Sequence, residues 1–190
     1  MFYKFNKIVS IIFSLGSIIL LVALDQWTKL LAIKYLMNKR DFVIIPNVLQ
    51  LHYLENTGAA FSLLEGQQLL FAIITPVLLI ALIILLIKMP QNKKFSALNY
   101  IIVFLIAGAI GNYIDRIANN YVVDFIYFSL INFPVFNVAD CYVTVSVILL
   151  FILILFYYKD DDFEEIKQSL RFKNNGWVYY YNWRFNWFRY

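Results

Sequence analysis

The chain has 190 residues, of which 62% are hydrophobic and only 15% are charged. Soluble domains are nearer half apolar and a quarter charged, so the composition excludes a soluble globular or disordered chain. One cysteine and one histidine exclude an intramolecular disulfide, a cysteine-based metal cluster and the common zinc sites. The net charge of +4 fits a nucleic-acid binder, but in so apolar a chain it more simply marks the basic flanks of membrane spans. We therefore expect an integral membrane protein that binds a phospholipid bilayer and no nucleic acid.

Four apolar stretches are each about as long as a helix that crosses a hydrocarbon core of roughly 30 Å. The first has a basic start like that of a secretory signal peptide, but no small-residue cleavage site follows it, so an uncleaved span is expected. The sequence predicts an all-α membrane protein with four transmembrane helices. The predicted spans are residues 8–24, 69–87, 97–114 and 141–158.

The connection after the first span is long enough to fold. Residues 42–46 and 48–53 are rich in β-forming side chains, and the second run partly alternates apolar with polar residues. We expect a small extracytoplasmic β-cradle within residues 41–62, lying on the outer membrane surface.

Basic residues near the spans set the expected orientation. Most of them fall on one side of a four-span arrangement, which favours a multi-pass protein with both termini in the cytoplasm. Lys29, Lys34, Lys39 and Arg40 in the first connection weaken the rule, but they precede a stretch without lysine or arginine from 41 to 87. The connections after spans one and three, and any site that they form, then lie near the outer leaflet. The basic residues on the cytoplasmic side are Lys4, Lys7, Lys88, Lys93, Lys94 and Lys159.

Residues 159–190 form an expected cytoplasmic tail, separate from a membrane domain of residues 1–158. The tail has an acidic cluster and then an aromatic-rich run from residue 177. Aromatic rings of this kind can lie in the headgroup zone of a bilayer, and an extension without a task is the alternative.

Polar residues close to the spans are the candidates for function. Asp25 and Lys29 have the i, i+4 spacing that allows an ion pair along one helix face, although a solvated helix end is the alternative. Asn56 and Gly58 begin a stretch of small and polar residues. Such a stretch lets the backbone approach a ligand closely, but an ordinary loop explains it nearly as well.

The end of the third span is also polar. Asn112, Asp115 and Arg116 have i, i+3 and i+4 spacing, so they share one face of a helix. A plain ion pair between Asp115 and Arg116 at the helix end is the alternative. Gly108 and Gly111 just before them permit close helix packing.

Asp124 and Asp140 are single carboxylates inside or beside apolar runs. Two carboxyl groups that share a site cannot both ionise easily, so one keeps a proton near neutral pH. The ionised group can then activate a water, while the protonated group binds the carbonyl oxygen of a peptide. This chemistry is that of an aspartic-protease pair. A helix N-cap is the alternative role for Asp140.

Five motifs occur in order around the four spans and together resemble bacterial lipoprotein signal peptidase, or signal peptidase II, over residues 8–158. That family comprises aspartic endopeptidases of the bacterial inner membrane, with the site near the outer leaflet. They remove signal peptides from prolipoproteins by cutting before a diacylglyceryl-modified cysteine, and they need no metal or cofactor. The motifs are Asp25-Gln26-Trp27-Thr28-Lys29, Asn56-Thr57-Gly58-Ala59-Ala60-Phe61, Gly111-Asn112-Tyr113-Ile114-Asp115-Arg116, Val122-Val123-Asp124-Phe125 and Phe136-Asn137-Val138-Ala139-Asp140.

The resemblance implies a role for each motif residue. Asp124 and Asp140 would be the catalytic pair, and Asn56 and Gly58 would line the substrate site. A lipidated prolipoprotein would be the substrate, and we expect the enzyme to be a monomer. The remaining residues would have supporting roles: Asn112, Asp115, Arg116 and Asn137 would orient the pair and the substrate, and Asp25 and Lys29 would support the outer end of the first span.

Two other classes fit part of the pattern. A phospholipid-synthesis enzyme could hold Mg²⁺ through Asp115, Asp124 and Asp140, although no span carries a run of aspartates at helical spacing. A proton-coupled transporter could use aspartates within the membrane as relays. The carboxylates here are expected at one membrane face, which disfavours transport.

Overall fold

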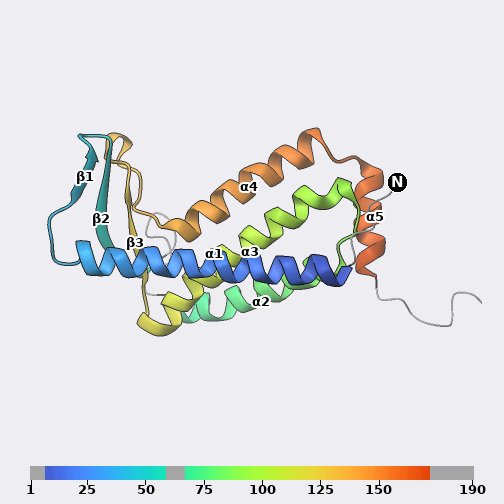
Figure 1. The fold of residues 1–190 in the computed structure, drawn as a ribbon, viewed down its shortest axis with the longest axis horizontal. Coiled ribbons are helices and arrows are strands. Elements are labelled where there is room, and N and C mark those ends of the chain that lie inside the picture. Colours follow the sequence, from blue (N-terminus) through green and yellow to red (C-terminus); the bar gives the residue numbers. More distant parts are fainter. Residues whose placement is uncertain (1–6, 59–66, 172–190) are drawn as a thin grey trace, which may run out of the picture.

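The computed structural model describes residues 7–58 and 67–171. In this part of the chain, four helices are long and apolar enough to cross a membrane. A three-stranded sheet lies at one end of the bundle and the short helix α5 (Asp160–Leu170) at the other (Figure 1). The prediction of four membrane helices and a small sheet is confirmed. The four long helices are α1 (Lys7–Leu36), α2 (Gln68–Lys88), α3 (Ser96–Asn119) and α4 (Val138–Phe156).

The sheet combines two connections that are far apart in the sequence. Strands β1 (Phe42–Ile45) and β2 (Leu49–Asn56) form an antiparallel hairpin in the first connection, as predicted. Strand β3 (Val122–Tyr127) comes from the connection between α3 and α4 and pairs antiparallel with β2. No strand is predicted from the sequence at β3, where the residues form only a short apolar run around one carboxylate. The strand order is β1-β2-β3.

Helix α1 is longer than the predicted span, which ends at Leu24. It continues to Leu36 because its last turns pack beneath the sheet, where Ala32 and Leu36 are buried against side chains of β3. The helix therefore does not end at Asp25 and Lys29. Both residues lie well inside the helix and are buried.

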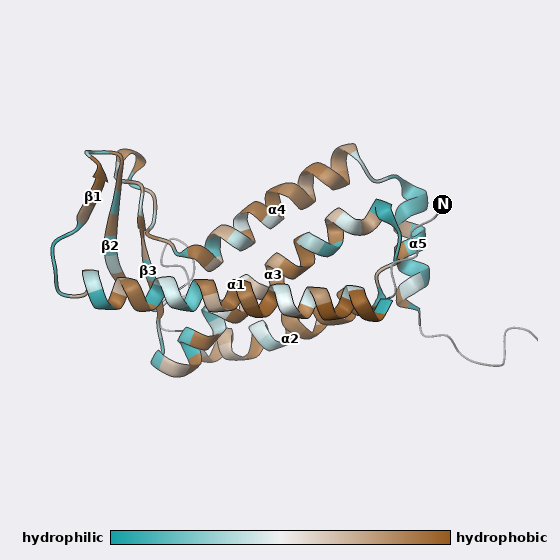
Figure 2. Ribbon diagram, viewed as in Figure 1, coloured by the Kyte–Doolittle hydropathy of each residue, from teal (hydrophilic) through white to brown (hydrophobic). Residues whose placement is uncertain are grey.

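Helix α3 is the centre of the bundle and packs against α1, α2 and α4. A Cβ atom at Gly108 would lie 2.7 Å from the carbonyl oxygen of Ala139, so the missing side chain is what lets α4 approach. The helix also ends later than predicted, at Asn119, with Asn120 in the left-handed conformation at its C-cap. Apolar side chains cover the middle of all four helices, as expected for surfaces that face lipid (Figure 2).

Helix α5 forms the start of the predicted tail and is the polar element at the end of the bundle (Figure 2). It packs against the connection between α2 and α3, which includes the 3₁₀ turn η2 (Lys93–Phe95). Lys94 Nζ lies 2.5 Å from Asp162 Oδ1, and Lys88 Nζ donates to the carbonyl oxygen of Leu170 over 2.9 Å. The acidic cluster of the tail is therefore part of the packed structure. The aromatic-rich run from residue 177 lies outside the described residues.

Candidate active site

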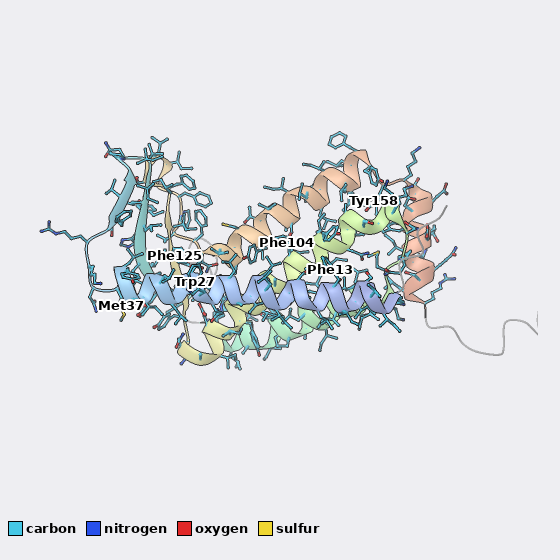
Figure 3. All side chains as sticks on the ribbon, viewed as in Figure 1. Phe13, Trp27, Met37, Phe104, Phe125 and Tyr158 are labelled. Carbon is cyan, nitrogen blue, oxygen red and sulfur yellow. The ribbon has the colours of Figure 1, made fainter. Side chains whose placement is uncertain are left out.

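The side chains expected at the active site converge where the helix bundle meets the sheet. Trp27 and Phe125, labelled in Figure 3, mark this level of the molecule. The structure brings all ten residues into one region through a connected set of contacts. They are Asp25 and Lys29 of α1, Asn56 at the end of β2 with Gly58 beyond it, Asn112, Asp115 and Arg116 of α3, Asp124 of β3, and Asn137 and Asp140 at the start of α4.

Strand pairing places Asp124 beside Asn56. Asp124 lies opposite Leu54 in the β2–β3 register, so it shares a face of the sheet with Asn56, two residues further along β2. Asn56 Nδ2 donates to Asp124 Oδ2 over 2.8 Å, and Asn137 Nδ2 donates to Oδ1 over 2.6 Å. Asp124 is only 1% exposed. Both of its carboxyl oxygens are thus held by amide donors in a site almost closed to water.

The segment before α4 delivers Asn137 to this strand. Phe136 N–H donates to the carbonyl oxygen of Ile126 over 3.0 Å, and Ile126 N–H donates back to Phe136 over 2.8 Å. This short antiparallel bridge lies next to Asn137 in the sequence. The Asn137 side chain is fully buried and reaches Asp124.

Asp140 is oriented by the start of α4. Asn137 Oδ1 accepts from Asp140 N–H over 3.0 Å, and Asp140 Oδ2 accepts from Asn137 N–H over 3.1 Å, which together make a capping box. The alternative expectation that Asp140 is the N-cap is wrong, because Asn137 holds that position. The second oxygen of Asp140 accepts from Asn112 Nδ2 over 2.8 Å, and Asp140 stays half-buried.

Asn112 connects the two aspartates to the residues beneath them. Its Oδ1 accepts from Asn137 Nδ2 over 3.0 Å and from Lys29 Nζ over 2.9 Å, while its Nδ2 donates to Asp140. Asn112 and Asn137 therefore link Asp124, Asp140 and the Lys29 ammonium through side-chain hydrogen bonds. Each amide uses both its donor and its acceptor, which fixes its orientation.

A buried ion-pair cluster lies below the aspartates. Lys29 Nζ is 2.9 Å from Asp25 Oδ2 and 3.1 Å from Asp115 Oδ2, and these side chains are at most 5% exposed. The predicted pair of Asp25 and Lys29 is confirmed, and the alternative of a solvated helix end is wrong. The alternative pairing of Asp115 with Arg116 is also wrong, since Asp115 turns to Lys29.

The two carboxylates of this cluster also hold backbone groups of other elements. Asp25 Oδ1 accepts from the N–H of Ala139 over 2.9 Å, and Asp115 Oδ2 accepts from the N–H of Val123 over 3.1 Å. Ala139 and Val123 each precede one of the candidate catalytic aspartates in the sequence. The cluster therefore fixes the backbone beside Asp140 and beside Asp124.

Gln26 is a member of the site that sequence reasoning did not single out. Its Nε2 donates to Asp115 Oδ1 over 2.9 Å and to the carbonyl oxygen of Gly111 over 3.1 Å. Its position inside the first motif, between Asp25 and Lys29, is the only sequence feature that indicates a role in the site. A neutral amide is not by itself a sign of function, although here it binds one of the buried carboxylates.

Arg116 lies on the other side of the site and faces the chain after β2. Its Nη2 donates to the carbonyl oxygen of Gly58 over 3.1 Å, and Gly58 N–H donates to Asn56 Oδ1 over 2.9 Å. The guanidinium also stacks on the ring of Phe71 in α2, with 4.5 Å from Cζ to the ring centroid. Arg116 thus connects α2 and α3 to the turn that carries Asn56.

Burial and charge shift the acidity of Asp124. Removal from water, and then the neighbouring Asp140 carboxylate, raise its pKa from 3.8 to about 7, although the amides of Asn56 and Asn137 oppose the shift. Asp124 is therefore partly protonated near neutral pH.

Two features of the sequence remain, His52 and part of the second motif. His52 is on strand β2 and its Nδ1 lies 2.8 Å from Asp41 Oδ1, so it pairs outside the candidate site. Residues 59–61 of the second motif lie outside the described residues.

Comparison with known proteins identifies the family. Residues 17–156 match the family model described as Signal peptidase (SPase) II. A lipoprotein signal peptidase of Caldanaerobacter subterraneus subsp. tengcongensis is 47% identical over 136 residues, which cover 71% of this chain and 90% of that protein. One from Enterococcus faecalis is 45% identical over 136 residues, 72% of this chain and 83% of that protein.

A solved structure of a bacterial membrane enzyme has the same fold. It is 37% identical with a TM-score of 0.70, and the match covers 82% of this chain and 92% of that one. The family match replaces the alternatives of a magnesium-dependent phospholipid enzyme and a proton-coupled transporter. The chain belongs to the signal peptidase II family of membrane peptidases.

Proposed function

We propose that this chain is an aspartic endopeptidase in which Asp124 and Asp140 form the catalytic pair. The reaction of the family is the removal of signal peptides from prolipoproteins, and we assign cleavage before a diacylglyceryl-modified cysteine. The observation that carries the proposal is the shared contact with Asn137, which binds the side chain of Asp124 and forms the capping box with Asp140. One carboxyl group is buried and the other is half-buried, so the two differ in environment.

This difference assigns the roles of the two groups. Asp124 holds the proton in the active form, because burial and the Asp140 carboxylate raise its pKa to about 7. Asp140 then serves as the general base. It takes a proton from a water molecule, whose oxygen bonds to the peptide carbonyl carbon, while Asp124 transfers its proton to the carbonyl oxygen.

The second half of the reaction restores both groups. The carbon–nitrogen bond breaks, and the leaving amine takes the proton from Asp140. The hydroxyl proton of the intermediate returns to Asp124 as the new carboxylic acid forms. No net charge leaves the pair, so a site of low polarity can complete the cycle.

The surrounding residues hold this geometry. Asn56, Asn112 and Asn137 donate to the carboxyl oxygens and fix their planes. The ammonium of Lys29 lies behind Asn112 and offsets part of the negative charge. Arg116 and Gly58 lie beside Asn56, where they line the substrate site.

The proposed orientation puts both termini in the cytoplasm and the catalytic pair near the outer leaflet. Lys88 and Lys94 contact α5. The sheet, whose strand β3 carries Asp124, lies at the other end of the bundle (Figure 1). Basic residues near the spans favour the cytoplasmic side. The lipidated substrate would thus meet the pair at the outer edge of the bilayer.

Purified enzyme with a lipidated and an unlipidated prolipoprotein tests the proposal. We expect cleavage of the lipidated form alone, and loss of at least ~1,000-fold in rate for Asp124→Asn and Asp140→Asn. Asp161→Asn, an exposed aspartate of α5, is the matched control and keeps the wild-type rate. Substantial cleavage by either catalytic variant, in correctly folded protein, would overturn the pair. Equal cleavage of the unlipidated form would overturn the substrate assignment alone.

A further inference from the structure

A second site lies at the end of the bundle far from the aspartates. A cavity of about 590 Å³ lies between the first turns of α1 and the start of α3, a size within the usual range for small-molecule sites. Phe13, labelled in Figure 3, lines it in the half of α1 that is nearer to α5. Its lining residue Ser10 precedes Asp25 by about 22 Å along the helix axis. The cavity is thus at the opposite membrane boundary and is no part of the candidate active site.

One wall of the cavity is a row of serines from α1. Ser10, Ser14 and Ser17 follow one another at four and three residues, so they share a helix face. Ser14 is only 8% exposed, yet within the described part of the chain its hydroxyl has no hydrogen-bond partner. It also lacks the bond to the preceding turn that helix serines often make. The Ser14 hydroxyl is thus free to donate to a ligand with acceptor oxygens, and Asn99 Oδ1 of the same lining is a buried acceptor without a partner among the described residues.

A cation lies at the mouth of the same cavity. Lys93 of η2 lines it, is exposed, and forms no ion pair with any residue in 7–58 or 67–171. The neighbouring basic residue differs, because Lys94 is paired with Asp162. Lys7 lies one turn before Ser10 on the face of α1 that carries the serines, which adds a second positive charge.

The rest of the lining is mixed. Its apolar part consists of Val9, Phe13, Tyr100 and Val103, and its polar part of Gln91, Asn92, Ser96 and Asn99. Val103 lies ten residues beyond Lys93 in the sequence, on α3, so the cavity extends from the charged mouth toward the middle of the bilayer. Phe13 and Tyr100 line the length between them. The mouth is therefore charged and polar, with Lys93, Gln91 and Asn92, and the interior combines apolar side chains with Ser17 and Asn99. A glycerophospholipid likewise has a polar part of phosphate and ester carbonyls, followed by an acyl chain.

We propose that this cavity binds one anionic glycerophospholipid from the leaflet opposite to the candidate active site. The phosphate pairs with Lys93, the ester carbonyl oxygens accept hydrogen bonds from Ser10 and Ser14, and one acyl chain lies along Phe13 toward Val103. The proposal does not depend on which residues carry out peptide cleavage.

Native mass spectrometry of the delipidated full-length protein tests the site, with added phosphatidylglycerol and phosphatidylcholine of the same chain length. We expect one phosphatidylglycerol to bind at least fivefold more tightly than phosphatidylcholine. Lys93→Gln should weaken phosphatidylglycerol binding about fivefold, the effect of one basic residue near an anionic lipid. Ser14→Leu should abolish binding by filling the cavity. Lys34→Gln, at the other end of α1, is the matched control and keeps wild-type binding.

Three results would overturn the proposal. The first is equal binding of the two lipids, and the second is unchanged binding in Lys93→Gln, whose exposed side chain can be replaced without disturbing the fold. The third is lipid binding by a chain truncated after Arg171 but not by the full-length chain. That result would mean that residues 172–190, and not a lipid, occupy the cavity. Peptidase activity of Lys93→Gln reports that the variant is folded.

Discussion

The side-chain amide of Asn137 donates a hydrogen bond to Asp124 over 2.6 Å, while the carbonyl oxygen of the same amide caps helix α4. Asn137 therefore positions Asp140 by capping the helix, and it binds the carboxyl group of Asp124 by a direct hydrogen bond. The two tasks use different atoms of one side chain. Substitutions can separate them.

Asn137→Ser should keep the helix and lose catalysis. Serine is a good N-cap residue, so we expect a change of less than about 1 kcal/mol in the free energy of unfolding. Serine lacks the amide donor to Asp124, and we expect the rate of cleavage to fall at least ~10-fold. Asn137→Ala loses both functions and should be less stable by a further ~1 kcal/mol. Thermal unfolding and prolipoprotein cleavage, measured on both variants, check this. Full activity in Asn137→Ser would show that the amide donor is not needed.

The rate of cleavage should fall as the pH rises through about 7. In the proposed mechanism Asp124 must hold a proton, so its pKa of about 7 sets the alkaline side of the pH profile. Asp140 contributes to that raised pKa, so Asp140→Asn should move the pKa of Asp124 down. Infrared spectroscopy of the protonated carboxyl group measures this in the inactive variant. A pKa that stays near 7 without Asp140 would leave burial as the sole cause.

The same shift predicts how stability depends on pH. The folded protein binds the Asp124 proton more tightly than the unfolded chain does, because the pKa rises from 3.8 to about 7 on folding. The contribution to stability is complete below the unfolded pKa and is lost as the pH rises through the folded one. The difference in stability between Asp124→Asn and wild type should therefore change with pH. It should be more favourable to the variant at about pH 8 than at about pH 5. Melting temperatures of both proteins at the two pH values provide the check.

Gly111→Ala should damage the site, while Gly16→Ala should not. A Cβ at Gly111 would lie 2.5 Å from Asp25 Oδ2 and 3.3 Å from the Cβ of Ala139. Overpacking of this kind costs about 1–3 kcal/mol, and here it also displaces a carboxylate of the ion-pair cluster. A Cβ at Gly16 meets nothing within 4 Å, so alanine there should be neutral or stabilising. Melting temperatures and cleavage rates of the two variants decide. Equal behaviour would mean that α1 and α3 can separate at no cost.

Lys29→Met should unfold or strongly destabilise the protein. It leaves Asp25 and Asp115 buried without the ammonium that lies 2.9 Å and 3.1 Å from them. Breaking a buried ion pair in this way costs about 3–5 kcal/mol. Lys34→Met, on the exposed part of the same helix, is the control. Adding Asp25→Asn to Lys29→Met should recover part of the loss. No recovery would indicate that lost packing, and not an unpaired carboxylate, is the cause.

The sequence is sufficient to predict the four spans, the β1–β2 hairpin and the pairing of Asp25 with Lys29. These features depend on local patterns: long apolar runs, alternation along a strand and i, i+4 spacing. Strand β3 is different, because its pairing with β2 joins residues about 70 apart, such as Asn56 and Asp124. A single sequence carries no direct record of such a contact. The meeting of Asp124 and Asn137 is of the same kind.

The end of α1 and the role of Gln26 could not be predicted for a related reason. The hydropathy of the span falls at Asp25, and this fall indicates the membrane edge when the residues that pair with Asp25 are unknown. In the structure, Lys29 and Asp115 compensate that charge, so the helix can continue in a buried environment. Gln26 gains its importance only from the position of Asp115, a residue 89 positions away. Tertiary contacts decide both points.

The hydrogen bond from Ala139 N–H to Asp25 has a consequence for the order of assembly in time. The two residues are 114 positions apart, and Asp25 is synthesised with the first span while Ala139 belongs to the last. Until α4 is inserted, the Asp25 carboxylate cannot accept the hydrogen bond from Ala139, and Asp140 is not yet beside Asp124. A growing chain therefore lacks one member of the proposed catalytic pair until α4 is made. If that pair is catalytic, the peptidase becomes active only after its last span has packed against the others.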